Sequence, residues 1–458
     1  MRTHLEARKD RRAFVRRGIA VICLLLGGAA TAAAQIARTE LVDPTANIDF
    51  PSYGHRVALS GDGRTALVGG DDSSCAGGAG CGKADVFSRQ GDGTWVLTAT
   101  LVSPAPVQFE HFGFSLALSQ DGTIALIGGP GHNCPAVSSC GAAYVFELQG
   151  GVWTARPTVT AADPQPGAGF GTVVSLSADG GTAMITSSAA GVGSGGAVYV
   201  FTGTGSAWSQ MAKLTSPVST GHYFGLRATL SRDGTTILAA ARECDDVCAA
   251  GYVFVRSGAT WAQQAHLDTQ AASPMFDPIT VALSADGNTA LLGASHDCSS
   301  PQACPGLSMF ERNGTAWSTV QDIQVPGAVP GDRLGYSFAL SDDGQTLWLG
   351  APGTLCDIIL PNCGVAYLLK RSAAGFDLRQ VIPSPFAHRP VGFPEWIATS
   401  ADGTTAVMGM IGGPETAFAY STAGLIPDAP TLGGPGLAAL AVLLAAAGAI
   451  VLRRRIAA

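Results

Sequence analysis

Ten of the eleven cysteines offer the first chemistry in this chain, because they occur as five close pairs, while Cys23 lies near the N-terminus. The pairs are Cys75 and Cys81, Cys134 and Cys140, Cys244 and Cys248, Cys298 and Cys304, and Cys356 and Cys363. An even number of closely paired cysteines is typical of disulfides in exported proteins. Zinc binding is the alternative, but the short ligand spacing and the companion histidines of zinc sites are missing. We therefore predict five disulfides, each closing a short loop.

A Ser-x-Asp-Gly unit that recurs along the chain supplies a second set of candidate side chains. Its aspartates are Asp62, Asp121, Asp179, Asp233, Asp286, Asp343 and Asp402. Calcium needs about six to eight oxygen ligands, whereas each unit offers one carboxylate. Ser, Asp and Gly are also the residues of a tight turn, in which Asp bonds the backbone and Gly adopts a positive φ. We predict turns, with calcium binding as the alternative.

Further ionisable side chains fall in the segments expected to be loops. Those of the cysteine-paired loops are Asp71, Asp72, His132, Glu243, Asp245, Asp246, His296, Asp297 and Asp357, and those between the repeats are Glu110, His111, His222, Tyr223, Asp332, Arg333, His388 and Arg389. Loops on a rigid scaffold are common binding surfaces. If both sets share one face, that face is the candidate binding site. The alternative is a set of solvated loops that disulfides merely make durable.

The elements that must position these side chains are strands in seven repeats. The aspartates of the Ser-x-Asp-Gly units recur at intervals of 53 to 59 residues, which suits one four-stranded propeller blade per repeat. In the second repeat we expect strands over 112–119, 123–128 and 142–147 and a fourth from Trp153, separated by Gly-bearing turns. The sequence therefore predicts an all-β, seven-bladed β-propeller over residues 35–424, with loops between second and third strands on the same face as the inter-blade connections.

The seventh repeat ends after its third expected strand, Phe418-Ala419-Tyr420. Residues 39–44, Thr-Glu-Leu-Val-Asp-Pro, resemble the end of the fourth strand at 99–104, Ala-Thr-Leu-Val-Ser-Pro. We therefore expect the N-terminal segment to complete the last blade. Such a strand closes the ring and removes a sheet edge that could pair with other chains.

The opening residues of the repeats carry a family resemblance. Tyr53-Gly54, Phe112-Gly113, Phe170-Gly171 and Phe224-Gly225, with Gly350-Ala351-Pro352 after a second strand, resemble FG-GAP repeats. These repeats form the integrin α-chain propeller and occur in many bacterial surface proteins. The resemblance covers roughly residues 36–424, but repeats five to seven depart at their opening pairs, Phe276-Asp277, Gly335-Tyr336 and Phe393-Pro394. It implies a propeller that binds an extracellular partner, without the aspartate-rich calcium loops of its integrin relatives.

Residues 1–34 have the pattern of a signal peptide. A basic region is followed by an apolar stretch from Ile19 to about Ala30 and by Ala32-Ala33-Ala34, so we expect cleavage before Gln35. The run from Asp10 to Arg16 also resembles a twin-arginine export signal. An arginine-rich signal for general secretion is the alternative. Either reading places the mature chain outside the cytoplasm.

Residues 425–458 are predicted to be a sorting signal with a transmembrane segment. Pro430-Thr431-Leu432 opens an apolar segment that runs to Leu452 and ends at Arg453-Arg454-Arg455, which is long enough to span a bilayer with the arginines in the cytoplasm. It is similar to bacterial sorting tails that a membrane-embedded enzyme removes, although Ala429 stands where that family has Ile. A permanent membrane anchor is the alternative.

Charge and motifs narrow the function. The formal net charge is −7, and the body is more acidic still because ten of the 27 Lys and Arg residues lie in the two terminal segments. This argues against nucleic acid and anionic lipid as partners. The sequence contains no nucleophile elbow or phosphate loop and indicates no cofactor. We expect a non-catalytic binding or adhesion propeller at the cell surface or secreted, with an unidentified protein or glycan ligand. Its other partners would be the export and tail-processing machinery.

Two alternatives remain at this point. One is a secreted hydrolase or lyase acting on polysaccharide or peptide, and the other is a structural envelope protein. Propellers assemble sites from residues far apart in sequence, so a hidden active site would appear as several acidic or histidine side chains meeting in the central channel. A channel lined by small side chains would argue against it.

Overall fold

The computed structural model describes residues 36–42, 52–75, 78–187, 195–216, 224–243, 248–272, 279–294, 307–326, 328, 331–354, 364–373, 375–386, 392–411 and 416–422. The predicted signal peptide and sorting tail lie outside these ranges. One compact unit, Arg38–Ser421, holds the strands, apart from the first residue of β1. In the described part of the chain, no helix is long and apolar enough to cross a membrane.

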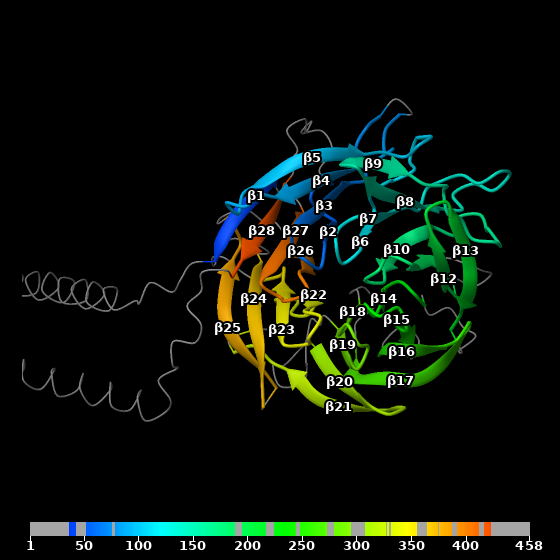
Figure 1. Cartoon of the computed structure of the whole chain (residues 1–458). Coiled ribbons are helices and arrows are strands. Elements are labelled where there is room, and N and C mark those ends of the chain that lie inside the picture. Colours follow the sequence, from blue (N-terminus) through cyan, green and yellow to red (C-terminus); the bar gives the residue numbers. More distant parts are fainter. Residues whose placement is uncertain are drawn as a thin grey trace, which may run out of the picture. The chain divides into compact units, whose positions relative to one another are not determined.

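Seven four-stranded sheets form a ring within this unit (Figure 1), and each sheet is one blade. Blade 1 comprises β2 (Val57–Leu59), β3 (Thr65–Gly70), β4 (Lys83–Arg89) and β5 (Trp95–Leu101), and blade 2 comprises β6 (Ser115–Leu118), β7 (Ile124–Gly129), β8 (Ala142–Gln149) and β9 (Val152–Ala155). Blade 3 comprises β10 (Phe170–Leu176), β11 (Thr182–Ser187), β12 (Ala197–Thr204) and β13 (Ala207–Leu214), and blade 4 comprises β14 (Ala228–Leu230), β15 (Thr236–Glu243), β16 (Cys248–Ser257) and β17 (Thr260–Ala272).

The remaining blades follow the same order around the ring. Blade 5 comprises β18 (Ile279–Leu283), β19 (Thr289–Ala294), β20 (Leu307–Asn313) and β21 (Ala316–Ile323), and blade 6 comprises β22 (Ser337–Leu340), β23 (Thr346–Ala351), β24 (Val365–Ser372) and β25 (Gly375–Pro383). Blade 7 comprises β26 (Gly392–Thr399), β27 (Thr405–Ile411), β28 (Thr416–Ser421) and β1 (Ala37–Val42). The predicted all-β, seven-bladed propeller is confirmed.

The N-terminal strand completes the last blade, as predicted. Strand β1 lies beside β28 at the outer edge of the sheet, where the blue and orange-red ends of the chain meet in Figure 1. The Leu41 side chain is fully buried, and the Thr416 hydroxyl donates to the Leu41 carbonyl at 3.2 Å. The ring is therefore closed by strand pairing between the two ends of the propeller.

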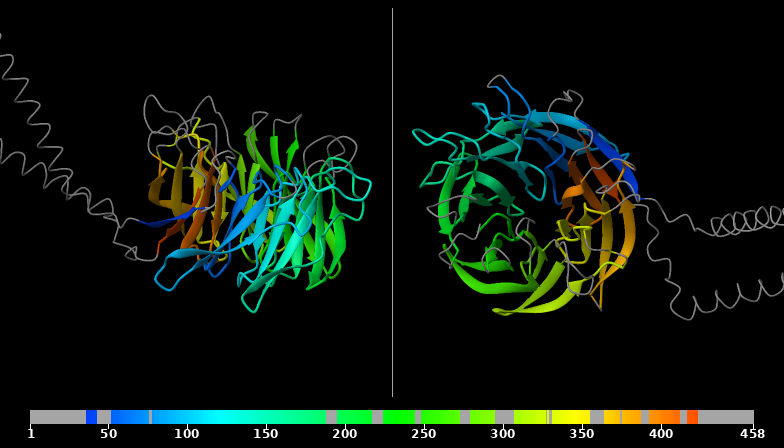
Figure 2. Two further views of the ribbon diagram at one scale, coloured as in Figure 1. Left: turned by 90° about the horizontal axis from the view of Figure 1, so that it is seen from above. Right: turned by 180° about the vertical axis from the view of Figure 1, so that it is seen from behind.

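Burial changes from the axis to the outside of each blade. In blade 1, the second strand β3 is buried along almost its whole length, whereas the fourth strand β5 alternates between partly buried and exposed side chains. A strand covered on both faces has a continuous run of apolar residues, whereas in an outer strand apolar and polar residues alternate. The first strands surround the axis, and Figure 2 shows the ring from the side and from behind.

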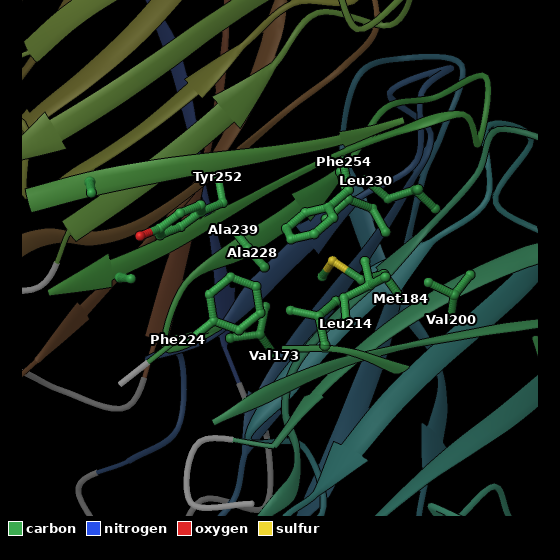
Figure 3. Close-up of a cluster of buried hydrophobic side chains, with 14 residues drawn as sticks. Val173, Met184, Val200, Leu214, Phe224, Ala228, Leu230, Ala239, Tyr252 and Phe254 are labelled. Carbon is green, nitrogen blue, oxygen red and sulfur yellow. The ribbon is translucent and has the colours of Figure 1, made fainter. Parts of the chain in front are cut away.

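Neighbouring blades pack through continuous buried clusters. Between blades 3 and 4, Val173 and Met184 meet Phe224 and Leu230 (Figure 3). Complete burial of a large apolar side chain contributes roughly 1.5–3 kcal/mol relative to leaving it exposed. The apolar residues that give the sequence its periodicity therefore also join one blade to the next.

The opening aromatic residue of a repeat has one packing role in several blades. Its ring packs on two aromatic rings of the third strand: Phe112 on Tyr144 and Phe146, Phe170 on Tyr199 and Phe201, and Phe224 on Tyr252 and Phe254, with centroid distances of 5.2–5.9 Å. The following glycine must lack a side chain, because Gly113 has φ 95° and a Cβ there would meet the Lys83 carbonyl of blade 1.

This use of the opening pair corrects two sequence expectations. The first strand of blade 2 begins at Ser115 and not at Phe112, because Phe112 forms a bridge to Gly82 of blade 1. In repeat six, Gly335 has φ 85° and its amide bonds the Gly350 carbonyl, as the Gly113 amide bonds the Gly128 carbonyl. Repeat six therefore keeps the glycine, and its departure lies in the preceding Leu334.

The Ser-x-Asp-Gly units all form the same turn. In each of the seven, the Ser hydroxyl donates to the Asp carboxylate at 2.5–2.7 Å, and the Gly has a φ between 64° and 72°. The turn prediction is confirmed, since these carboxylates accept bonds from their own turns. We call the end of the propeller that carries these turns the turn face and the opposite end the loop face.

Backbone hydrogen bonds join the turns of all seven blades into a closed ring. Each bond runs from an amide of one turn to a carbonyl of the turn in the next blade, at 2.7–3.1 Å: Asp62 to Gln120, Gln120 to Ala178, Ala178 to Arg232, Asp233 to Ala285, Ala285 to Asp342, Asp342 to Ala401, and Ala401 to Gly61. The turn face is thus held by a cycle of main-chain bonds that does not depend on the identity of the variable residue.

Candidate functional site

A cavity of about 250 Å³ lies on the propeller axis. The innermost strands of all seven blades line it, namely β2, β6, β10, β14, β18, β22 and β26. Most lining residues are Val, Ala or Leu, and the charged ones are Arg227, Arg232 and Asp342. Because every first strand runs from the loop face to the turn face, residues before a strand lie at the loop end of the cavity and residues after it lie at the turn end.

The turn end of the cavity carries a paired charge. Arg232 follows β14 and Asp342 follows β22, and Arg232 Nε lies 3.2 Å from Asp342 Oδ1. The two charges offset each other at this end.

The loop end carries two arginines that share one aromatic neighbour. Arg227 precedes β14 and lines the cavity, whereas Arg56 precedes β2 and lies beside the cavity, outside its lining residues. Their guanidinium carbons lie 4.6 Å and 5.1 Å from the ring centroid of Trp396, which belongs to β26. Such cation–π contacts stabilise a cation without neutralising its charge.

Few acceptors serve these two guanidinium groups. Arg56 Nε donates to the Phe114 carbonyl at 3.1 Å, and Arg227 Nη1 donates to the Leu226 carbonyl at 3.2 Å. Arg227 Nε is buried without an acceptor among the described residues. Burial, and then the charge of Arg56, lowers the pKa of Arg227 to about 10, which still leaves it cationic at neutral pH.

A carboxylate close to the arginines is bound to other partners. Glu395 Oε1 accepts a hydrogen bond from the Tyr336 hydroxyl at 2.7 Å and lies 3.5 Å from His55 Nε2. Burial opposes ionisation of Glu395, but His55 and Tyr336 together hold its pKa below the ordinary value. Glu395 is therefore an anion, and it forms no ion pair with either arginine.

Three residues of the predicted binding face meet at the loop face between blades 1 and 2. His111 Nδ1 lies 3.3 Å from Asp72 Oδ1 and 3.8 Å from Asp71 Oδ2. Their ligand atoms all lie within 4.8 Å of one another, and this donor set has the chemistry to hold a divalent cation. Burial, and then the charge of Asp72, raises the pKa of Asp71.

His132 and Glu110 form a second cluster in blade 2. Glu110 is fully buried, and its carboxylate accepts bonds from Tyr144 Oη, from His132 Nδ1 at 3.0 Å and from Ser103 Oγ at 3.1 Å. Burial opposes ionisation of Glu110, but these hydrogen bonds lower its pKa. With its oxygens occupied, Glu110 fixes the connection between blades to the cysteine-paired loop.

Of the other predicted binding residues, some lie in the described ranges and some lie outside them. Arg333 lies with its guanidinium 5.4 Å from the Tyr336 ring centroid, Asp332 is buried, and Glu243 ends β15. The remaining predicted residues lie outside the described ranges: Asp245, Asp246, His296, Asp297, Asp357, His222, Tyr223, His388 and Arg389. Their part in a binding face stays a prediction.

Two of the five predicted disulfides are present. Cys75 is bonded to Cys81, and Cys134 to Cys140. Cys248 begins β16, but Cys244, Cys298, Cys304, Cys356 and Cys363 lie outside the described residues. Disulfides persist in oxidising compartments, so the two bonds point to an exported protein.

The arginines at the loop end were missed by the sequence analysis, although a signal existed. Arg56 and Arg227 each stand two residues after the opening glycine of their repeat, where repeats two and three have Ser115 and Val173. A comparison of that one position across the repeats would have revealed both. Nothing in the local sequence indicates that Trp396 lies beside them.

Comparisons with known proteins support the fold and no activity. No family model and no curated protein matches the sequence. The structure is similar to hydrazine synthase of Kuenenia stuttgartiensis, with TM-score 0.54 and 13% identity over 84% of this chain and 99% of that chain. It is also similar to the periplasmic gluconolactonase PpgL of Pseudomonas aeruginosa, with TM-score 0.44 and 16% identity over 72% and 85% of the two chains. At 13% identity, the likeness to hydrazine synthase shows the fold alone.

Proposed function

We propose that this chain is an exported, non-catalytic binding protein whose ligand enters the loop end of the axial cavity. The observation that carries this proposal is the composition of that end: a cavity of about 250 Å³ whose lining combines Val, Ala and Leu side chains with polar groups, and which has Arg227, Tyr336 and Trp396 at its loop end. Apolar walls with a few converging polar groups are typical of sites for small ligands or for one anchoring group of a larger ligand.

The cavity favours binding over hydrolysis or elimination. An acid–base mechanism needs a titratable group near the reacting atoms with a pKa close to the working pH. Asp342 is the one carboxylate among the described lining residues, and it is paired with Arg232. Glu395, beside the cavity, is an ionised acceptor for Tyr336. Both carboxylates are therefore engaged by partners within the protein.

Saturable binding by the mature chain tests this function. A panel of glycans, peptides and envelope proteins would be screened by surface plasmon resonance against wild type and Ala339→Phe. Ala339 lines the cavity, so the larger side chain should fill it and abolish binding of any hit. Val381→Phe on the outer face of β25, where Val381 is half exposed, is the matched control and should bind normally. No saturable hit, or turnover of a polysaccharide or peptide that Ala339→Phe removes, would overturn the proposal.

Export is part of the same proposal. It is supported by the two disulfides and by the signal-peptide pattern of residues 1–34, and we propose that residues 425–458 act as a sorting tail or membrane anchor. Mass spectrometry of the protein from its native cells should find a mature N-terminus at Gln35. A product lacking residues 425–458 would identify the segment as a removable tail, and retention in the cytoplasm with residue 1 intact would contradict export.

We also propose a relationship to FG-GAP repeat proteins. It is supported by the opening aromatic–glycine pairs of repeats one to four and by the shared packing of Phe112, Phe170 and Phe224. Exchange of Phe112 for Leu, the residue before the glycine in repeat six, should be tolerated better than exchange of Gly113 for Ala. Thermal unfolding of the two variants would measure the difference, and equal losses would remove this support.

A further inference from the structure

The loop end of the cavity holds two arginines that form no ion pair among the described residues. Arg56 and Arg227 act on each other's charge, and the acidic side chains that act on them are Glu395 and Asp71. Neither carboxylate forms an ion pair with an arginine among the described residues. Both arginines are half-buried, and a cation removed from water without an ion pair is costly, so an anion that enters this end gains from both guanidinium groups.

The donors of these arginines are only partly used. A guanidinium has five N–H donors. Within the described part of the chain, Arg227 uses one of them, to the Leu226 carbonyl, and its buried Nε has no acceptor. Arg56 likewise makes a single bond, from Nε to the Phe114 carbonyl. The remaining N–H groups can bind an incoming acceptor.

Aromatic rings hold the two guanidinium groups while leaving these donors unengaged. Arg56 lies over both Trp396, at 4.6 Å, and Phe114, at 5.1 Å, and Arg227 lies over Trp396 at 5.1 Å. Cation–π contacts use the face of the guanidinium, whereas carboxylates are bound through its edge. The site is therefore preorganised for an anion before any ligand arrives.

The charge count favours a singly charged anion. Two arginines face the ionised Glu395, and Asp71 lies close enough to act on Arg56. A doubly charged phosphate would meet the field of these acids, whereas a carboxylate brings less negative charge into that field and matches the fork geometry of arginine. The cavity volume of about 250 Å³ limits the body that follows the carboxylate to a small one.

We infer that Arg227 and Arg56 bind the carboxylate group of a small organic acid, or of a larger ligand's terminal acidic unit, at the loop end of the axial cavity. This inference rests on the proposed function, because it names the ligand chemistry of the same site. Two kinds of molecule that carry a carboxylate suit this cavity. A hydroxylated molecule can form hydrogen bonds with the hydroxyl oxygens of Thr229, Thr280 and Tyr336, and an apolar molecule can pack against the Val and Ala side chains.

Titration calorimetry with defined probes tests the ligand class. Gluconate represents a hydroxylated carboxylate, hexanoate an apolar carboxylate, hexanol a neutral apolar body, and inorganic phosphate a small dianion. We expect at least one of the two carboxylates to bind and hexanol and phosphate to bind at least tenfold more weakly. Preference between gluconate and hexanoate assigns the body of the ligand. Tighter binding of phosphate or hexanol than of both carboxylates would overturn the inference.

Matched arginine variants test the residues. Arg227→Met and Arg56→Met should each weaken carboxylate binding at least tenfold, and Arg227→Lys should retain part of it. Arg156→Met is the control, because Arg156 is paired with Glu147 and is not among the residues that line the cavity, and it should bind within twofold of wild type. Unchanged binding in both Met variants at the loop end would overturn the assignment.

The two proposals fail in different ways. If Ala339→Phe abolishes binding of a panel ligand while Arg227→Met and Arg56→Met do not, and no carboxylate competes, the binding function stands and the carboxylate inference falls. If carboxylates bind through Arg227 but no glycan, peptide or protein carrying one does, the site chemistry stands and the proposed function must be restricted to small free acids. If Ala339→Phe changes nothing, the cavity is not the site and both fall.

Discussion

The two ends of the axial cavity are built by the same strands but differ in whether their charged and polar groups are paired. At the turn face, main-chain bonds join all seven turns, and Arg232 is paired with Asp342. At the loop face, Arg56 and Arg227 have no ion pair, and Arg227 Nε has no acceptor among the described residues. Proteins violate local rules chiefly at functional sites. The contrast therefore supports the proposal that the turn end stabilises the fold and the loop end binds the ligand.

The largest predicted effect lies at the turn face of blade 4. Ser231, which follows β14 and is buried, donates to Asp233 at 2.5 Å and accepts from the Thr236 amide at 2.9 Å. Ser231→Ala leaves that buried amide without its acceptor, so it should lower the free energy of unfolding by about 1–3 kcal/mol. Urea unfolding measures the loss. Exposed Ser209→Ala in β13 is the control, and equal effects of the two variants would break the comparison.

The second effect concerns how the loop face is held together. Cys134→Ser combined with Cys140→Ser opens a short loop, which should lower stability by about 2 kcal/mol at most on the chain-entropy model. Hydrogen exchange should quicken in the residues around His132, while the amides of the turn-face ring keep their protection. Equal loss of protection at both faces would mean that the two ends do not behave as separate regions.

The third effect is a dependence of the free energy of unfolding on pH, which Glu110 at the loop face causes. The pKa of Glu110 is lowered in the folded protein, so its contribution is complete above its ordinary value of 4.5 and is lost as the pH falls through the folded value. Glu110→Gln should cost about 1 kcal/mol at pH 7 and should flatten the decline in stability below pH 4.5. Urea unfolding at several pH values checks this. A parallel decline in both proteins would show that Glu110 does not carry the acid sensitivity.

The sequence was sufficient for the architecture because the repeat is encoded locally. The Ser-x-Asp-Gly turns, the opening aromatic residue and the resemblance of residues 39–44 to a fourth strand each depend on short-range pattern, and together they predicted seven blades and the closing strand. Asp71, Asp72 and His111 were expected on one face, but the sequence did not predict that they lie together.

The binding end of the cavity was harder to predict because it depends on ring closure. Arg56 and Arg227 lie in blades 1 and 4 and meet at Trp396 of blade 7, so three distant repeats must come together before the cluster exists. Their common position after the opening glycine was visible in the sequence, but the position of the axis was not. Short-range sequence patterns therefore predict the blades, whereas the residues that meet at the axis are identified only from the three-dimensional structure.

A smaller effect is expected from the turn-face ion pair. The side chains of Arg232 and Asp342 are 22% and 24% exposed, and partly solvated pairs contribute about 0.2–1 kcal/mol. Asp342→Asn should lose that amount at low salt and less at high salt, since the main-chain bonds of the Asp342 turn remain. Thermal unfolding at two ionic strengths measures it. A loss well above 1 kcal/mol would mean that charge pairing, and not the backbone ring, holds this end.

The smallest change in stability should come from the residue at the other end of the same strand. Arg227 precedes β14 as Ser231 follows it, yet Arg227→Met removes a half-buried cation that has no ion pair among the described residues, so the free energy of unfolding should stay the same or rise by up to about 1 kcal/mol. Urea unfolding of Arg227→Met and Ser231→Ala compares two residues that flank the same strand, β14, which has three residues. A loss of more than about 1 kcal/mol in Arg227→Met would make this arginine a structural residue, and the division between a stabilising end and a binding end would fail. Unchanged stability would mean that folding does not require the half-buried charge of Arg227. Binding of a ligand would then explain why the arginine is present.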